Sequence, residues 1–232
     1  MKLTIDNKSI DFFNFNTKNV KIGIAVSGGA DSALLLYLTA KHIKDAEIIP
    51  WSGYEIENKN YGFRPFTIYD AKNVVDVVRN KLPDANISQH YIWSYDRRGQ
   101  NKKIYMKDEA KKCLDNGIID LYVSGRTANP PKEILYEIEK KLSEHTPGPI
   151  DTSRSHTHLE RPSDTYYAPF ININKKVISS LYQKYNCMKD LFSVTQSCVG
   201  WSHQTNWFTE PCKQCFWCHE RKWAFGRYDG ES

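Results

Sequence analysis

The sequence has no apolar stretch long enough to cross a membrane, because a run of about 18 apolar residues occurs nowhere in it. Its amino terminus, MKLTIDNKSIDFFNFN, has no continuous apolar segment of the kind found in signal peptides. The net charge of +5 is small, which argues against nucleic acid as a direct substrate but permits an anionic small ligand. We therefore expect a cytoplasmic protein that has no membrane partner.

Two common nucleotide-binding motifs are also missing. The sequence contains no Gly-Lys-Ser or Gly-Lys-Thr, which excludes a Walker P-loop. It contains no G-x-G-x-x-G, which excludes the dinucleotide fingerprint. Internal repeats and low-complexity segments are absent as well. The chain of 232 residues is long enough for one α/β domain with a small appendage.

Apolar strand patterns alternate with helical patterns over the first half of the chain. Strands are expected at 20–26, 46–51, 87–93 and 118–125, and helices at 31–43, 71–82 and 104–117. This order predicts an α/β fold, in which a parallel sheet is flanked by helices in a Rossmann-like arrangement. Ligands of such sheets bind beyond the carboxyl ends of the strands.

The second half of the chain is less regular. Helical patterns recur at 132–145 and 174–185, and between them 145–168 reads as a long polar loop that could act as a lid. We predict a domain over 1–185 and a small carboxyl-terminal module over 186–232.

A glycine turn follows the first predicted buried strand, in the stretch AVSGGADS (25–32). Such a turn exposes backbone N–H groups, and the helix after it adds its positive end, so the pair can bind phosphate. A carboxylate beside phosphates needs a bridging cation, so Asp31 predicts Mg²⁺. The alternative is an ordinary turn with Asp31 as the helix N-cap. A second glycine turn, SGRTANPP, follows the fourth strand at the same predicted edge of the sheet.

Four of the six cysteines lie close together near the carboxyl terminus, at Cys198, Cys212, Cys215 and Cys218. The spacing C-x13-C-x2-C-x2-C predicts a closed, structural Zn²⁺ site with four thiolate ligands. A redox C-x2-C pair is the alternative. Cys113 and Cys187 stand apart and are interpreted as plain thiols.

The segment SGGADS resembles the SGGxDS signature of the PP-loop ATP pyrophosphatases. The tail, with TQSC, CKQCFWC, Arg221 and Phe225, resembles that of the 7-cyano-7-deazaguanine synthases in this superfamily, as does APFININKKVI with Pro169 and Lys175. The segments SGYEIENKNYGF and SGRTANPP depart from that family's pattern.

The resemblance implies an ATP-dependent carbon–nitrogen ligase. Such an enzyme adenylates 7-carboxy-7-deazaguanine and uses ammonia to form the nitrile 7-cyano-7-deazaguanine in queuosine biosynthesis. It implies ATP, Mg²⁺ and Zn²⁺ as cofactors, a deazapurine carboxylate and ammonia as substrates, and is compatible with a homodimer. Alternatives are action on another acceptor, such as a tRNA base, and a non-catalytic nucleotide-binding module.

The same resemblance implies roles for individual residues in catalysis and nucleotide binding. Asp31, Lys175 and Arg126 are the candidate catalytic residues, with Lys175 and Arg126 neutralising charge near the α-phosphate. A solvated lysine at a helix start is the alternative for Lys175, and a turn-surface arginine for Arg126. The candidate nucleotide-binding residues are Ala25, Val26, Ser27, Gly28, Gly29, Ala30, Asp31, Ser32 and Gly125.

Overall fold

The computed structural model describes residues 2–5, 8–13, 15–55, 67–95, 102–142, 154 and 164–231. A five-stranded parallel sheet in the order β5-β4-β3-β6-β7 forms its centre. Its strands are β3 (Lys21–Ala25), β4 (Glu47–Glu55), β5 (Tyr91–Tyr95), β6 (Leu121–Val123) and β7 (Tyr166–Tyr167). The predicted parallel sheet flanked by helices is confirmed.

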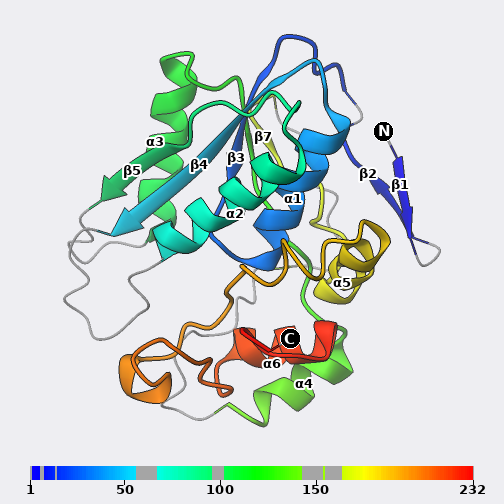
Figure 1. The fold of residues 1–232 in the computed structure, drawn as a ribbon, viewed down its shortest axis with the longest axis vertical. Helices are drawn as coiled ribbons and strands as arrows, with labels where there is room; N and C mark the ends of the chain where they lie inside the picture. The colour runs from blue at the N-terminus through cyan, green and yellow to red at the C-terminus, as the bar shows by residue number, and fades with distance from the viewer. Residues whose placement is uncertain are drawn as a thin grey trace.

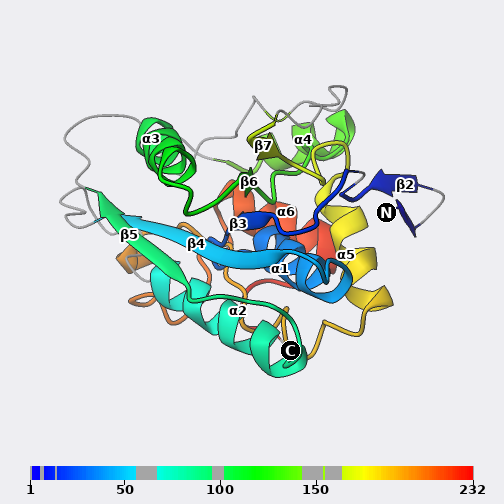
Figure 2. The same cartoon turned by 90° about the horizontal axis from the view of Figure 1, so that it is seen from above.

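Helices cover both faces of the sheet. Figure 2 shows α1 (Ala30–His42) and α2 (Thr67–Lys81) on one face and α3 (Lys102–Asp115) on the other. The remaining helices are α4 (Lys132–Glu139), α5 (Lys175–Lys184), the short 3-10 helix η1 (Ser202–Gln204) and α6 (Phe216–Phe225). In Figure 1, α4 and α6 lie below the carboxyl ends of the strands. The cysteine-bearing tail therefore lies at the edge of the sheet where ligands are expected.

Helix α1 is the centre of the main core. Its apolar residues are not confined to one stripe, and Leu34, Leu35 and Leu36 are all completely buried. The helix contacts β3 and β4 on the sheet side and α2 and α5 on its other sides, which explains why it is apolar all round. Burial of each leucine contributes about 1.5–3 kcal/mol relative to an exposed side chain. This packing fixes the first turn of α1, which faces the site.

The third predicted strand, 87–93, begins later than expected. Ile87 forms only an isolated bridge with Ile48, and continuous pairing between β4 and β5 starts at Trp51 and Tyr91. The reason is Pro50. Ile48 forms backbone hydrogen bonds with Asn86 and Ser88, so the next residue of β4 whose N–H would point toward β5 is residue 50. Residue 50 is proline, which has no N–H to donate. The ladder resumes only beyond it.

Other boundaries also differ from the prediction. Strand β4 runs on to Glu55, and β6 covers only three residues of the predicted 118–125 because Ile118 and Ile119 pack beside α3 instead. Helix α4 ends at Glu139 rather than at 145. The antiparallel hairpin of β1 (Lys2–Ile5) and β2 (Lys8–Asp11), strand β7 and helix α6 were not predicted.

Several predictions concern residues outside the described part of the chain. Of the predicted loop 145–168, only residue 154 and residues 164–168 are described, so its role as a lid stays a prediction. The division at residue 185 also stays a prediction. Within the described ranges, no helix is both long and apolar enough to cross a membrane.

Candidate functional site

The turn between β3 and α1 requires glycine at position 28. Gly28 has φ +80°, and a Cβ there would lie 2.4 Å from the Cβ of Asp70. Gly29 is the N-cap of α1 and makes no side-chain cap, so the interpretation of Asp31 as an N-cap is wrong. Asp31 lies instead in the first turn, where the helix dipole stabilises a negative charge.

The two serines of the turn hold its backbone in place. The Ser32 hydroxyl accepts from the backbone N–H of Ser27 at 3.1 Å and donates to the carbonyl of Gly29 at 3.1 Å. The Ser27 hydroxyl accepts from the Gly29 N–H at 3.3 Å. The first N–H groups of a helix have no partner within the helix, so those of Ala30, Asp31 and Ser32 point toward the end of α1 where an anion can bind.

The second glycine turn lies at the same edge of the sheet as the first, as predicted, and the structure also shows the two in contact. A Cβ on Gly125 would lie 2.9 Å from the backbone nitrogen of Ser32 and 3.0 Å from the carbonyl carbon of Asp31. Only glycine lets the chain after β6 approach the start of α1 this closely. The structure places Arg126 immediately after this contact, with a half-buried side chain.

A small apolar pocket opens beside the glycine turn at the carboxyl ends of β3 and β4. It has a volume of about 80 Å³, and its lining includes Ala25, Val26 and Ser27 from the predicted nucleotide site and Trp51, Gly53 and Met106 from other elements. Ser52, also in the lining, donates to the carbonyl of Val26 at 2.6 Å and lies 2.8 Å from Nε2 of His90. Burial lowers the pKa of His90 to about 4, so its ring is neutral at pH 7.

Lys175 lies at the centre of a buried charged cluster. Its ammonium is 3.3 Å from Oδ2 of Asp31 and 3.0 Å from Oε2 of Glu220, while Oε1 of Glu220 accepts from Arg154 at 2.7 Å. Lys175 is only 3% exposed, so the alternative of a solvated lysine is wrong. Although burial alone lowers the pKa of Lys175, the charges of Asp31 and Glu220 outweigh it and raise that pKa.

Asp31 has an unused ligand atom. Its Oδ1 is buried and has no hydrogen-bond partner among the described residues, whereas its Oδ2 faces Lys175. A carboxylate oxygen in the first turn of α1 has the chemistry of a Mg²⁺ ligand, and phosphates would bind at the same helix end. The residues present therefore fit the predicted cation.

Sequence reasoning missed Glu220 and Arg154. Glu220 lies two residues after Cys218 in the stretch FWCHERKWAF, where an adjacent acid and base among aromatic residues could have indicated buried ion pairs. Arg154 lies within the predicted loop 145–168 and gave no such signal. Its guanidinium also lies 5.1 Å from the centre of the Trp217 ring.

The four clustered cysteines come together as predicted. Their sulfur atoms all lie within 4.8 Å of one another, and those of Cys212 and Cys218 are 3.9 Å apart. Four thiolates bound at about 2.3 Å to one tetrahedral ion lie roughly 3.8 Å apart, so the cluster has the dimensions of a site for a single metal ion. Backbone N–H groups of Gly200, Cys212 and Cys218 donate to its sulfurs. Cys113 and Cys187 lie elsewhere in the core.

A second buried ion pair, Arg221–Asp229, lies within the carboxyl-terminal tail, and a backbone hydrogen bond joins the tail to the glycine turn. Arg221 lies 2.9 Å from Asp229, whose other carboxylate oxygen accepts from the N–H groups of Ser197 and Cys198. Between the cysteine segment and the turn, the N–H of Gln196 donates to the carbonyl of Gly28 at 2.9 Å. The tail therefore supports the turn directly.

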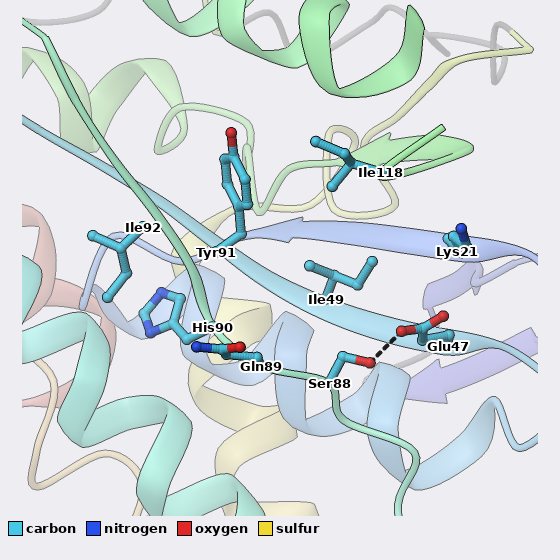
Figure 3. Close-up of a pocket in the computed structure, with 9 residues that line it drawn as sticks. All are labelled: Lys21, Glu47, Ile49, Ser88, Gln89, His90, Tyr91, Ile92 and Ile118. Carbon is cyan, nitrogen blue, oxygen red and sulfur yellow. Dashed lines mark hydrogen bonds between the residues drawn. The ribbon is translucent and has the colours of Figure 1, made fainter. Parts of the chain in front are cut away.

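A larger cavity of about 490 Å³ lies at the opposite end of the sheet (Figure 3). Lys21 and Glu47, at the amino ends of β3 and β4, line it, together with Ser88, His90 and Tyr91. None of the predicted site residues is in its lining. Because ligands of parallel sheets bind at the carboxyl edge, this cavity is not the candidate site.

No protein-family model matches the sequence. The tRNA-specific 2-thiouridylase MnmA 1 of Fusobacterium nucleatum subsp. nucleatum is 28% identical over 118 residues, covering 51% of this chain and 25% of that protein. The chain thus spans about a quarter of the length of this curated relative.

Among solved structures, the U34-tRNA thiolase NcsA from Methanococcus maripaludis, which carries a 4Fe-4S cluster, superposes with a TM-score of 0.45 and 11% identity. The superposition covers 73% of this chain and 58% of that one. Neither named protein is a 7-cyano-7-deazaguanine synthase. The weak sequence similarity agrees with the PP-loop resemblance of the glycine turn at the level of the superfamily.

Proposed function

We propose that this chain cleaves ATP between its α- and β-phosphates and transfers the adenylyl group to an acceptor oxygen. The observation that carries the proposal is the buried Oδ1 of Asp31, which lacks a hydrogen-bond partner within the described residues and lies in the first turn of α1. An anion site with a carboxylate at its rim requires a cation between the two, and ATP·Mg²⁺ supplies both partners.

Each residue then has a defined task. The N–H groups at the start of α1 bind the leaving pyrophosphate, and the contact of Gly125 with Ser32 keeps the turn in shape. Asp31 holds Mg²⁺, which neutralises charge on the phosphates. Lys175, with its ammonium beside Asp31, stabilises the negative charge that develops at the α-phosphate. Arg126 stays a candidate for the same task.

We propose 7-carboxy-7-deazaguanine as the acceptor. Its carboxylate attacks the α-phosphorus and expels pyrophosphate, and ammonia then displaces AMP to give an amide. The amide oxygen is adenylated by a second ATP, after which loss of AMP and a proton leaves the nitrile. The cysteine cluster holds Zn²⁺ as a structural ion, because all four of its tetrahedral positions are filled by thiolates.

A tRNA base is the second candidate acceptor. It is favoured by the 118 residues that match a tRNA-specific 2-thiouridylase. A tRNA thiolation would need a sulfur donor in place of ammonia.

Product analysis distinguishes the acceptors. The protein is incubated with ATP, Mg²⁺, ¹⁵N-ammonium and 7-carboxy-7-deazaguanine, and the products are analysed by mass spectrometry. The proposal predicts a nitrile that contains one ¹⁵N, with two AMP formed per nitrile. AMP formation that requires tRNA would support the second candidate. ATP binding without AMP formation on either acceptor would indicate a non-catalytic nucleotide-binding module.

A further inference from the structure

Glu220 brings a completely buried negative charge from the cysteine segment into the candidate nucleotide site. Its side chain is 0% exposed, with one oxygen 2.7 Å from Arg154 and the other 3.0 Å from Lys175. The adenylation chemistry proposed above does not use it. A buried carboxylate costs free energy unless it is paired, so its position calls for an explanation.

The ammonium of Lys175 is shared between two carboxylates. Lys175 is the first residue of α5, where the positive end of the helix disfavours a cation. The ammonium is held there by Asp31 on one side and Glu220 on the other. An ammonium has three donors and can serve both. With Glu220 and Arg154 included, the cluster contains two positive and two negative side chains and is neutral overall.

Removal of the charge on Glu220 would change this sharing. Asp31 would then be the one carboxylate left beside the ammonium in the described cluster, and Lys175 would move onto it. An ammonium that pairs closely with Asp31 competes with a cation for the same carboxylate. Glu220 therefore weakens the pairing of Lys175 with Asp31, because the ammonium is shared between the two carboxylates.

We propose that Glu220 is a positioning residue: it holds the ammonium of Lys175 back from Asp31, so that the Asp31 carboxylate can bind Mg²⁺. The proposal rests on the function proposed above. It also assigns a role to the cysteine cluster. Cys215 is the N-cap of α6 and Cys218 lies in its first turn, so a metal ion bound there fixes the helix that carries Glu220. In this way the metal site and the nucleotide site are coupled.

The test compares Glu220→Gln with Glu231→Gln. Glu231 is an exposed carboxylate of the same segment, paired with Lys213 and Lys222, and so controls for the loss of one charge. Binding of a non-hydrolysable ATP analogue is measured by calorimetry over a series of Mg²⁺ concentrations. For Glu220→Gln we expect the half-saturating Mg²⁺ concentration to rise about tenfold, with analogue affinity at saturating Mg²⁺ within about twofold of wild type. Glu231→Gln should match wild type.

A purely structural role for Glu220 gives a different result. Such a role would lower the unfolding midpoint of the variant and its affinity for the analogue at every Mg²⁺ concentration. A half-saturating Mg²⁺ concentration equal to that of wild type would overturn the proposal. If Glu220→Gln does not fold, the double variant Glu220→Gln/Arg154→Gln keeps the buried cluster neutral and is expected to show the same Mg²⁺ shift. Failure of the wild-type protein to bind the analogue at any Mg²⁺ concentration would instead refute the proposed function.

Discussion

The ammonium of Lys175 lies 3.3 Å from the carboxylate of Asp31, although one residue opens α5 and the other lies in the first turn of α1. Both side chains are largely buried. The pair joins the two segments that sequence resemblance singled out separately, SGGADS and APFININKKVI. It therefore makes one site out of two motifs.

Replacement of Lys175 by methionine is expected to destabilise the protein strongly. The variant leaves Asp31 and Glu220 buried without the cation between them, and breaking such a pair costs about 3–5 kcal/mol. Lys176→Met is the matched control, because Lys176 is the next residue and is exposed. Urea denaturation of the two variants gives the comparison, and equal stabilities would contradict the buried cluster.

Gly125→Ala should weaken nucleotide binding by about tenfold or more, because the new Cβ would press on the backbone of Ser32 and shift the turn. Gly117→Ala is the control, because Gly117 follows α3 and a Cβ there meets nothing within 4 Å. Its positive φ of 64° costs about 1–2 kcal/mol of stability. Calorimetry with an ATP analogue should therefore separate a binding defect in the first variant from a stability defect in the second.

The cysteine cluster should hold one metal ion per chain. Cys215→Ser is expected to abolish metal binding, whereas Cys113→Ser should keep the metal, since Cys113 is a buried thiol outside the cluster. Elemental analysis by mass spectrometry measures the content directly. Zinc at one equivalent is the expected result. Iron with acid-labile sulfide would contradict the assignment of a single ion.

Stability should fall as the pH is lowered below 6.5, in part because of His90. Burial lowers the pKa of His90 to about 4 in the folded protein, while the unfolded chain binds a proton near its ordinary value of 6.5. Between these values the unfolded state binds more protons, so stability is lost as the pH falls. His90→Asn removes this contribution. Urea unfolding at pH 7 and pH 5 should show a smaller difference for the variant than for wild type.

Some strands and helices were predicted from the sequence more closely than others. The buried strand at Lys21–Ala25 and helix α1 were predicted closely, because their apolar runs are continuous and end at glycine or polar residues. The start of β5 was not, because it depends on a missing donor at Pro50 in a neighbouring strand. Local patterns carry no information about such pairings.

The residues of the candidate site also differ in how far the sequence predicted them. The glycine turn and the clustered cysteines are short-range patterns, and the structure brings their members together as expected. The burial of Lys175 could not be inferred, because it depends on Glu220 and Arg154 from distant segments. Trp207 is largely exposed, whereas Trp217 is half-buried with its ring 5.4 Å from the ammonium of Lys175, so these two tryptophans of the tail lie in different environments.

The most direct test of the account is the fate of ATP in the presence of Mg²⁺, ammonium and 7-carboxy-7-deazaguanine. The account predicts that AMP and pyrophosphate appear in equal amounts, that their release requires the acceptor, and that Asp31→Ala abolishes it. Release of ADP and phosphate, or AMP release that persists in Asp31→Ala, would contradict the assignment of the glycine turn and Asp31 as the site of adenylation.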